Sequence, residues 1–496
     1  MAQSGNRRLS SIGLNRMDNL TEPASQRVVG FSDGAISQVG GRGAVFDRNP
    51  CAESVATHFG QTTRLAGPIL MGHLSNFAMT TTTLLLFGWL GSASLAAAGL
   101  AIRVAVSTNI LAGILLVAGV AASGANGGRD AKRVSGFYWN GLYLALALSV
   151  LSFAWMTVAP GLLAVLGQPP EVVAEAERIL HVLRWGEPAN LLRLGLMRTM
   201  LPALGMTWIL YALTPLSLVL YVVAGFGLVF GFSGLPPMGA IGIPVALVGV
   251  TWLTALVMLA AVHCGRSRSL IPFTRIRLSL LRELIRTGLP IGTLQGVDGI
   301  FFLIATVVVG QFGAAALAAH QIALNFGTIA YSLAVSFGDA AALRISYRRG
   351  ALAFQDARVA GFVGVTMGTV SMAAAALVVL AFPNVFIGLF IDINDPGNAA
   401  TLAASQSLVL FASLFIFADG VYGTGMGVLR GLGDNRYAML VVIIAYWGIG
   451  LPVGAAYHLL VGFGIEEVWL GLATLQGFIG LVLIQRYAKV TRQDPI

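Results

Sequence analysis

The sequence predicts an all-α membrane protein in which twelve transmembrane helices form two six-helix lobes related by pseudo-two-fold symmetry. Three observations lead to this prediction: the composition, the alternation of long apolar runs with short polar breaks, and a repeat that relates the two halves of the chain. Hydrophobic residues make up 56% of the 496 residues and charged residues only 10%, whereas about 25% of an ordinary soluble domain is charged. Such a composition cannot cover a water-facing surface, which argues against a soluble enzyme or a nucleic-acid-binding protein.

Residues 1–62 differ in composition from the rest of the chain, because they are rich in Ser, Gly, Asn and Arg and contain no long apolar run. No basic segment followed by an apolar one occurs here, so we expect no cleavable signal peptide. The segment is predicted to be a disordered cytoplasmic tail. A membrane-surface anchor built from Arg7, Arg8 and Arg16 is the alternative.

From residue 65 onward, long apolar runs alternate with short polar breaks. A helix needs about 20 apolar residues to cross the hydrocarbon core of a bilayer, and its backbone must satisfy its own hydrogen bonds there. The runs are therefore predicted to be membrane-spanning helices. They cover residues 66–90, 94–122, 134–160, 175–202, 207–231, 238–263, 283–311, 314–343, 357–389, 400–428, 437–461 and 465–487.

Arginine and lysine residues gather in alternate breaks between these spans, and the intervening breaks are neutral or acidic. Short cytoplasmic loops of membrane proteins carry an excess of these two residue types. We therefore expect both termini to be cytoplasmic, and the net charge of +9 follows from this topology. The basic breaks lie at residues 129–133, 266–286, 344–358, 430–436 and 486–492.

The two halves of the chain resemble each other in sequence. GSASLAAAGLA in the first half matches GAAALAAHQIA in the second, and the same alignment places Pro68 on Pro290. Further along, RWGEPANLLRLGLMR matches IFADGVYGTGMGVLR, which pairs Arg198 with Arg430 and Glu187 with Asp419. The repeat predicts two lobes of similar structure.

The long basic break divides the chain into an N-lobe with spans one to six (63–263), a cytoplasmic linker (264–286), a C-lobe with spans seven to twelve (287–490) and a cytoplasmic C-terminus (491–496). An even number of spans gives both lobes the same orientation. Parallel repeats of this kind place binding sites between the lobes near the middle of the membrane. A single packed bundle without a cavity, in which the 61 glycines serve helix packing alone, is the alternative.

Two acidic residues lie midway along predicted spans without a basic residue one helical turn away. They are Asp298 in span seven and Asp419 in span ten. Ionisable groups inside a membrane are costly and mark functional sites by default, and a buried carboxylate without a basic partner takes up a proton or binds a cation. We expect ion coupling or substrate binding at both, with structural hydrogen bonds between helices as the alternative.

Two further acids have arginines nearby in the sequence. Asp339 in span eight precedes Arg344 by five residues, so an interfacial ion pair is as compatible with the sequence as a binding site. Glu187 in span four lies between Arg184 and Arg193, and a local ion pair is the simpler interpretation there.

Signatures of soluble enzymes are missing from the sequence. It contains no glycine-rich phosphate loop followed by Lys-Ser or Lys-Thr, no HExxH and no GxSxG. Its two cysteines, Cys51 and Cys264, exclude a disulfide framework. We therefore expect a transporter that is driven by an ion gradient or by a separate partner, and not an enzyme. For His320 we expect a hydrogen bond across helices.

Several stretches are shared with a known family. They are GLP at the start of span seven, GAAALAAHQIALN entering span eight and FADGVYGTGMGVLRGLGDNRYAM from span ten into eleven, together with PILMGHLSN, LMRTMLPALGMT and GLPPMGAIGIPVA in the first half. In these stretches the chain, from about residue 65 to residue 490, resembles the multidrug and toxic compound extrusion (MATE) family of antiporters.

The resemblance implies roles for individual residues. In that family an acid ten positions after the Gly of the GLP motif takes part in cation coupling, and this position is Asp298. The acid of span ten, upstream of LRG, corresponds to Asp419, so a Na⁺ ion at these two residues is implied. Polar groups used in span eight make Asp339 and Asn325 further candidates.

The chain also departs from the family pattern. The Asp that members commonly carry fifteen residues after the Pro of span one is Thr83 here, and the usual Asn positions of span five fall near Tyr221 and Gly225. The site of the first lobe therefore looks dismantled, with Glu187 as a candidate replacement. Members often carry an aromatic residue four positions before the span-ten acid. This position is Phe415 here, which lacks a hydroxyl. Coupling is expected to rest on the second lobe, with Na⁺ or H⁺ as the ion.

Together these patterns predict an antiporter of the bacterial inner membrane that exports amphipathic, cationic organic compounds by alternating access. We expect a monomer in the lipid bilayer with a small-molecule substrate, no nucleic-acid partner and no cofactor besides the coupling ion. One alternative is a lipid-linked saccharide flippase of the same superfamily, indicated by Arg103 and Arg193 within spans. The other is a transport-inactive membrane scaffold, indicated by the altered motifs of the first lobe.

Overall fold

Helices account for almost all of the chain that the structure describes. In the computed structural model, all described residues fall in one unit, residues 45–496. No strand occurs among them. Most of the predicted tail lies outside the described residues. The described residues are 54–90, 92–165, 170–231, 237–264, 269, 271–460 and 464–493.

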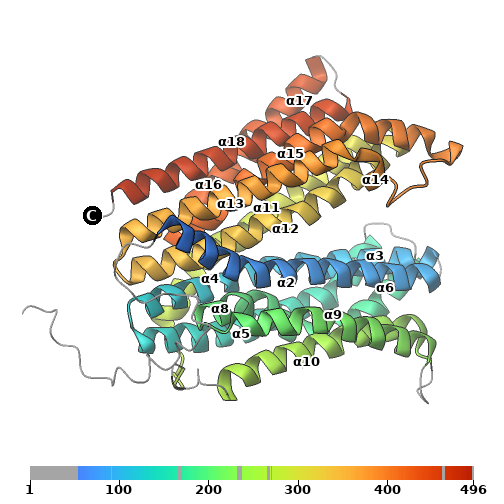
Figure 1. Cartoon of the computed structure of the whole chain (residues 1–496). Helices are drawn as coiled ribbons and strands as arrows, with labels where there is room; N and C mark the ends of the chain where they lie inside the picture. Colours follow the sequence, from blue (N-terminus) through green and yellow to red (C-terminus); the bar gives the residue numbers. More distant parts are fainter. Residues whose placement is uncertain are drawn as a thin grey trace, which may run out of the picture. The chain divides into compact units, whose positions relative to one another are not determined.

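The first half of the chain forms helices α2 to α10 (Figure 1). Its fourth predicted span is not one regular helix, because a 3-10 turn (Arg184–Gly186) and a π-helical turn (Leu191–Met197) interrupt it. The helices are α2 (Val55–Leu90), α3 (Ser92–Ser107), α4 (Asn109–Gly127), α5 (Ala131–Val165), α6 (Pro170–Leu183), α7 (Glu187–Asn190), α8 (Arg198–Ala203), α9 (Thr207–Phe230) and α10 (Gly242–Cys264).

The second half forms helices α11 to α18, and its eleventh predicted span contains a second π-helical turn (Ile444–Gly450). The helices are α11 (Leu278–Gly310), α12 (Ala314–Gly350), α13 (Phe354–Ala381), α14 (Pro383–Ile387), α15 (Ala399–Leu432), α16 (Asn435–Ile443), α17 (Leu451–Leu460) and α18 (Ile465–Arg492).

Two helices begin before the spans that the sequence predicts. Residues 55–62, expected in the tail, belong to α2, because their polar groups bind Arg344 of α12 and so gain partners in the fold. Residues 278–286, expected in the linker, begin α11. Here Leu280 and Leu284 are buried in the apolar core while the arginines of the same turns remain exposed, which is the pattern of an amphipathic helix.

Ten helical segments in the described part of the chain are long and apolar enough to cross a membrane. Helices α3 and α4 contribute to a single such segment, Ala97–Gly127. Two predicted spans are outside this group: α2, whose sequence contains the polar stretches HLSN and TTTT, and the interrupted segment from α6 to α8.

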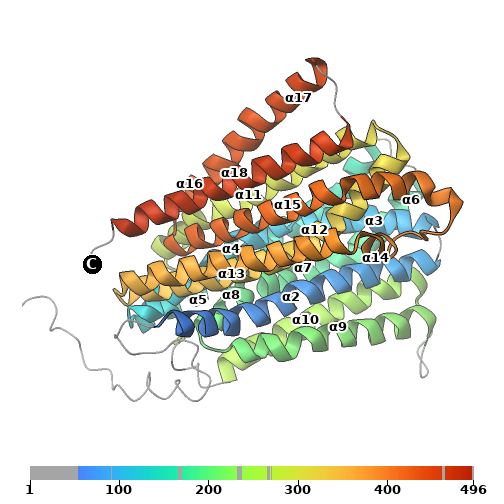
Figure 2. The ribbon, with the colours of Figure 1, turned by 45° about the horizontal axis from the view of Figure 1, so that its top comes forward.

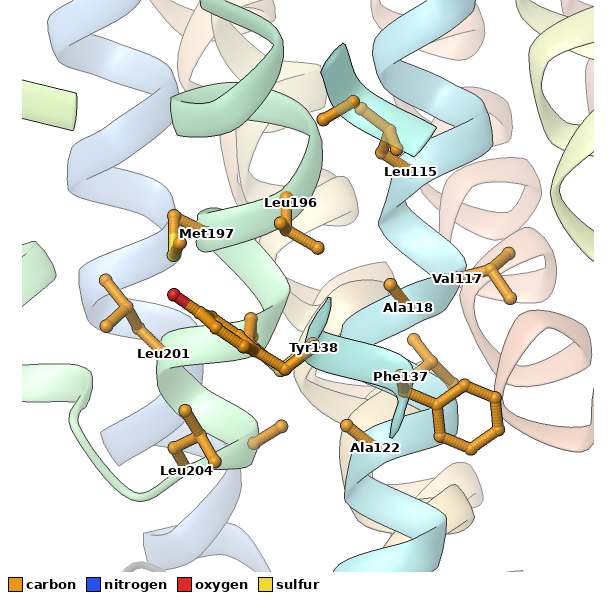
Figure 3. Packing of buried hydrophobic residues seen from close by; sticks show 14 of the residues in the cluster. Leu115, Val117, Ala118, Ala122, Phe137, Tyr138, Leu196, Met197, Leu201 and Leu204 are labelled. Carbon is orange, nitrogen blue, oxygen red and sulfur yellow. The ribbon is translucent and has the colours of Figure 1, made fainter. Parts of the chain in front are cut away.

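The apolar core consists of several clusters, of which two are large. The first joins α4, α5 and α8 with the start of α11, and Figure 3 shows Tyr138 of α5 beside Leu196 and Leu201 of the neighbouring segment. The second joins α11, α12, α15, α16 and α18. In Figures 1 and 2, the helices of the second half, in yellow to red, gather beside those of the first half. The two halves meet where α4 packs on α11 and α12 and where α2 packs on α12 and α13.

Glycines allow the closest helix crossings. A Cβ atom at Gly427 of α15 would overlap the backbone of Gly338 in α12, so this crossing brings two main chains into contact. Small residues at such crossings are the usual way in which membrane helices approach closely.

We expect Gly427→Ala to lower the unfolding temperature of the detergent-purified protein, because the added methyl group has no space and overpacking costs about 1–3 kcal/mol. The matched control is Gly471→Ala in α18, where a Cβ atom meets nothing within 4 Å. A thermal-shift assay of both variants checks this; equal unfolding temperatures would show that the crossing is not tightly packed.

Candidate functional site

The two unpaired acids of the second half lie in one network of buried polar side chains. Asp298 comes from α11 and accepts a hydrogen bond at Oδ2 from the hydroxyl of Tyr422 on α15, at 2.8 Å. Asp419, also on α15, is 7% exposed and accepts a hydrogen bond from Nε2 of Gln476 on α18, at 3.1 Å. The carboxylates lie close enough to interact electrostatically.

A tyrosine extends this network between the two acids. The hydroxyl of Tyr446 donates to Oε1 of Gln476 at 2.9 Å and also lies near Asp298. Its ring stacks on Phe301 with centroids 4.0 Å apart and an interplanar angle of 5°. Tyr446 belongs to the π-helical turn of the eleventh segment, a distortion that occurs frequently at functional sites.

The network leaves one acceptor without a partner. Oδ1 of Asp298 is buried and receives no hydrogen bond, and neither acid forms an ion pair with any described residue. An unpaired charge in a membrane interior is costly. The arrangement therefore has a place for a proton or a small cation beside Asp298. Among the described residues no three His, Cys, Asp or Glu side chains gather to hold a metal ion, so hydroxyl and amide oxygens would have to complete any ion site.

Asp339 of α12 has a different environment. It is 2% exposed and forms ion pairs with Arg198 of α8 and Arg430 of α15, the two arginines that the sequence repeat pairs. The expected pair with Arg344 was wrong, because five residues turn an α-helix by about 140° and place that arginine on another face. Arg344 instead donates to Thr62 of α2 at 2.7 Å.

Glu187 lies at the start of α7 and is 4% exposed. Its Oε2 accepts hydrogen bonds from Thr108 at 2.8 Å and from Ser152 at 2.6 Å. The expected local ion pair was wrong, since neither Arg184 nor Arg193 reaches its carboxylate. Arg184 instead donates to the hydroxyl of Thr157, and Arg193 donates to Oδ1 of Asn76.

A cavity in the first half is lined by both Glu187 and Thr83, the residue that stands where family members commonly carry an Asp. Its walls come from α2, α3, α4, α6, α7, α10 and the π-helical turn of the fourth segment. Thr83 lines it and shares a hydrogen bond of 2.6 Å with the hydroxyl of Tyr221. The polar residues of the lining are Asn76, Thr80, Thr83, Asn109, Glu187, Asn190, Arg193 and Thr251.

The polar residues of span eight do not join the acids. Asn325 donates from Nδ2 to the carbonyl of Gln321 in its own helix at 2.8 Å, and no hydrogen bond in the described chain connects it to Asp298 or Asp419. His320 accepts from Trp469 at 3.1 Å and is 3.0 Å from the hydroxyl of Thr306, which confirms the expected bonding across helices.

Sequence reasoning missed three members of the network: Tyr422, Tyr446 and Gln476. Tyr422 follows Asp419 by one helical turn, which is a local signal that could have been used. Tyr446 and Gln476 come from other helices, and their positions relative to the acids depend on how those helices pack.

Comparisons with known proteins identify the family. The sequence profile of the MatE family matches residues 68–233 and 299–456. A probable multidrug resistance protein NorM of Burkholderia pseudomallei is 36% identical over 439 residues, which cover 88% of this chain and 94% of that protein. A probable multidrug resistance protein NorM of Pseudomonas aeruginosa is 31% identical over 417 residues, covering 83% and 85%.

Solved structures share the fold at low sequence identity. The eukaryotic MATE transporter AtDTX14 superposes with a TM-score of 0.76 at 20% identity and covers 89% of this chain and 99% of its own. A multidrug resistance MATE family transporter in an outward-facing conformation gives 0.81 at 17% identity, covering 91% and 98%. With a profile that matches more than half of the chain and relatives that align over most of it, this integral membrane protein belongs to the MatE family of multidrug and toxic compound extrusion transporters.

Proposed function

We propose that the protein is a cation-coupled antiporter that exports amphipathic, cationic organic compounds from the bacterial cytoplasm, with Asp298 and Asp419 as its coupling residues. The observation that carries the proposal is the buried, unpartnered Oδ1 of Asp298 in a network that also contains the second unpaired acid. The names of the bacterial relatives, multidrug resistance proteins, support export of organic compounds as the activity.

In this mechanism, Na⁺ or H⁺ that enters from outside occupies the acids and neutralises them. Neutralisation removes the attraction for a cationic compound and relieves the repulsion between the two carboxylates, so the organic cation leaves outward. A ligand can shift the balance between conformations only through its different affinity for each. The hydrogen bonds from Tyr422 and Gln476 keep the carboxylates oriented in the ion-free state.

We propose a topology of twelve spans in two lobes, with both termini cytoplasmic and the lobes bounded as the sequence predicts. The helical segments support it, since α2 and the run from α6 to α8 are long enough to cross a bilayer although they carry polar residues. Some of these polar residues, among them Asn76, Thr83 and Glu187, line the first-half cavity. The transporter acts as a monomer in this proposal.

In alternating access the two halves separate at one end while they stay in contact at the other. We assign the end that is closed in this structure to the cytoplasmic side. Several polar contacts join the halves there, and three of them lie between α8 or α4 and α12. Asp339 binds Arg198, Ser123 of α4 donates to the carbonyl of Leu343 at 2.8 Å, and Ser346 of α12 donates to the carbonyl of Val120 at 2.7 Å. These contacts lie near the ends of helices that lead into the basic breaks, which supports the assignment.

A lipid-linked saccharide flippase fits these observations less well. Of the two arginines that suggested it, Arg103 is exposed and Arg193 shares its cavity with Glu187. A pyrophosphate carries several negative charges, and a neighbouring carboxylate would repel it.

We expect Asp298→Asn and Asp419→Asn each to abolish export of an organic cation by inverted membrane vesicles. An amide carries no charge, so it neither attracts the coupling ion nor is neutralised by it. Ethidium uptake is measured under an imposed Na⁺ gradient and, separately, an imposed pH gradient, which also identifies the coupling ion. The control is Glu177→Gln, which removes an exposed carboxylate from α6. Full ethidium transport by either Asp variant, at normal expression, would reject the role of that residue.

We expect Asp339→Asn to open the closed cytoplasmic end, because it leaves two partly buried arginines, Arg198 and Arg430, without their counter-ion. In a background with Cys51→Ser and Cys264→Ser, a cysteine that replaces the buried Ser123 reports on this end. Its labelling by a membrane-impermeant maleimide, added to inverted vesicles, should rise several-fold with Asp339→Asn.

A cysteine that replaces Ser413, buried within the second half, is the control for general loosening. Equal increases in labelling at both positions would mean that the variant unfolds, and no increase at residue 123 would contradict the gating role of Asp339.

A further inference from the structure

A groove at the surface of the second half collects three arginines. It lies between the first turns of α11 and the start of α16, with Arg282 and Arg286 on α11 and Arg436 on α16. All three are exposed, and their guanidinium groups form no hydrogen bond or ion pair with any described residue. The groove therefore combines uncompensated positive charge with an apolar surface. The apolar part of the lining consists of Leu278, Leu281 and Ile285.

The acids nearest to these arginines in the sequence are paired with other residues. Glu283, which follows Arg282, forms an ion pair with Arg133 of α5 at 3.1 Å. Asp434 forms one with Arg486 of α18 at 2.9 Å. Neither carboxylate lines the groove. The positive charge there is therefore left for a ligand from outside the chain.

One hydrogen bond holds the two walls of the groove together. Nδ2 of Asn435, the first residue of α16, donates to the carbonyl of Thr287 in α11 at 2.9 Å. Asn435 is 5% exposed, so this bond is shielded from water. Because Thr287 follows Arg286 and Asn435 precedes Arg436, the bond keeps the two arginine-bearing turns side by side. The groove is thus built by the packing of α11 against α16.

Exposed apolar side chains continue from the arginines along both helices. Leu289 follows Arg286 by three residues on α11, and Leu440 follows Arg436 by four on α16, so each lies about one helical turn further along. In the proposed topology both helices run from the cytoplasmic surface into the membrane, so the arginines lie at the surface and the leucines deeper. This order of charge and apolar surface is complementary to a phospholipid with an anionic headgroup.

We propose that this groove binds an anionic phospholipid of the cytoplasmic leaflet. Its phosphate is held by Arg282, Arg286 and Arg436, and its acyl chains lie along Leu289 and Leu440. A guanidinium binds phosphate through paired, charge-assisted hydrogen bonds, and basic pockets on the cytoplasmic side of membrane proteins bind lipid headgroups in this way. Only the choice of leaflet rests on the proposed topology, and the site does not depend on the proposed transport activity.

The test compares phosphatidylglycerol with phosphatidylcholine of the same acyl chains, because their headgroups differ in net charge. Binding of each lipid to the purified full-length protein in neutral detergent is measured by native mass spectrometry. The groove variant carries Arg282→Gln, Arg286→Gln and Arg436→Gln. Each basic residue near an anionic lipid strengthens binding about fivefold, so the affinity for phosphatidylglycerol should fall by more than about tenfold and that for phosphatidylcholine should change by less than about twofold.

The matched control replaces three exposed arginines from three different breaks, Arg129→Gln, Arg275→Gln and Arg492→Gln, and so makes the same change in net charge outside the groove. It should leave both affinities unchanged. If the control lowers the affinity for phosphatidylglycerol as much as the groove variant does, the binding is general charge attraction and the proposal is wrong. No loss of affinity in the groove variant overturns it as well.

Glycerol 3-phosphate, which has the phosphate without acyl chains, separates a lipid site from a site for soluble phosphates. Displacement of phosphatidylglycerol by an equal concentration of glycerol 3-phosphate would overturn the assignment to a lipid. If thermal unfolding shows that the groove variant does not fold, the double variant with Arg282→Gln and Arg436→Gln decides instead. The same selective loss is then expected, to a smaller extent.

Discussion

One buried carboxylate, Asp339, neutralises an arginine from each half of the protein and so links the two halves. Removing a guanidinium from water is costly, so Arg198 and Arg430 are stable in their partly buried positions because the chain supplies a negative charge there. Asp339 therefore fixes α8, α12 and α15 relative to one another. In the same arrangement, α4 forms hydrogen bonds with α12, and α12 and α15 make backbone contact at their glycines.

Ion pairing within the protein distinguishes the charged side chains that have a structural role from those that remain available for ligands. Asp339 and its arginines satisfy one another, whereas the described side chains that donate to Asp298 and Asp419 are neutral, as Tyr422 and Gln476 are. A neutral donor orients a carboxylate but does not remove its charge, so an incoming cation still gains by binding. Where a charge is neutralised inside the protein, a ligand gains little and the residue contributes to the fold.

The helices could be predicted from the sequence because the membrane leaves few alternatives for a long apolar run, and a helical segment occupies every predicted range. Their ends were less predictable. The start of α2 depends on Arg344, which is remote in the sequence. In the candidate site, a feature was predicted where its signal is local, such as the absence of a basic partner at Asp298 and Asp419. It was missed where partners come from other helices, as for Gln476 and for the arginines that bind Asp339.

The repeat has kept the position of one acid in each half while the surroundings have diverged. Glu187 and Asp419 are paired in the alignment, and both are buried and held by neutral donors. Beside Asp419 the second half adds Asp298, so its site has negative charge alone. Beside Glu187 the first half adds Arg193 at the place of a glycine, so its cavity has both signs. The two halves therefore present different fields to a ligand, because one site carries charge of a single sign and the other carries both.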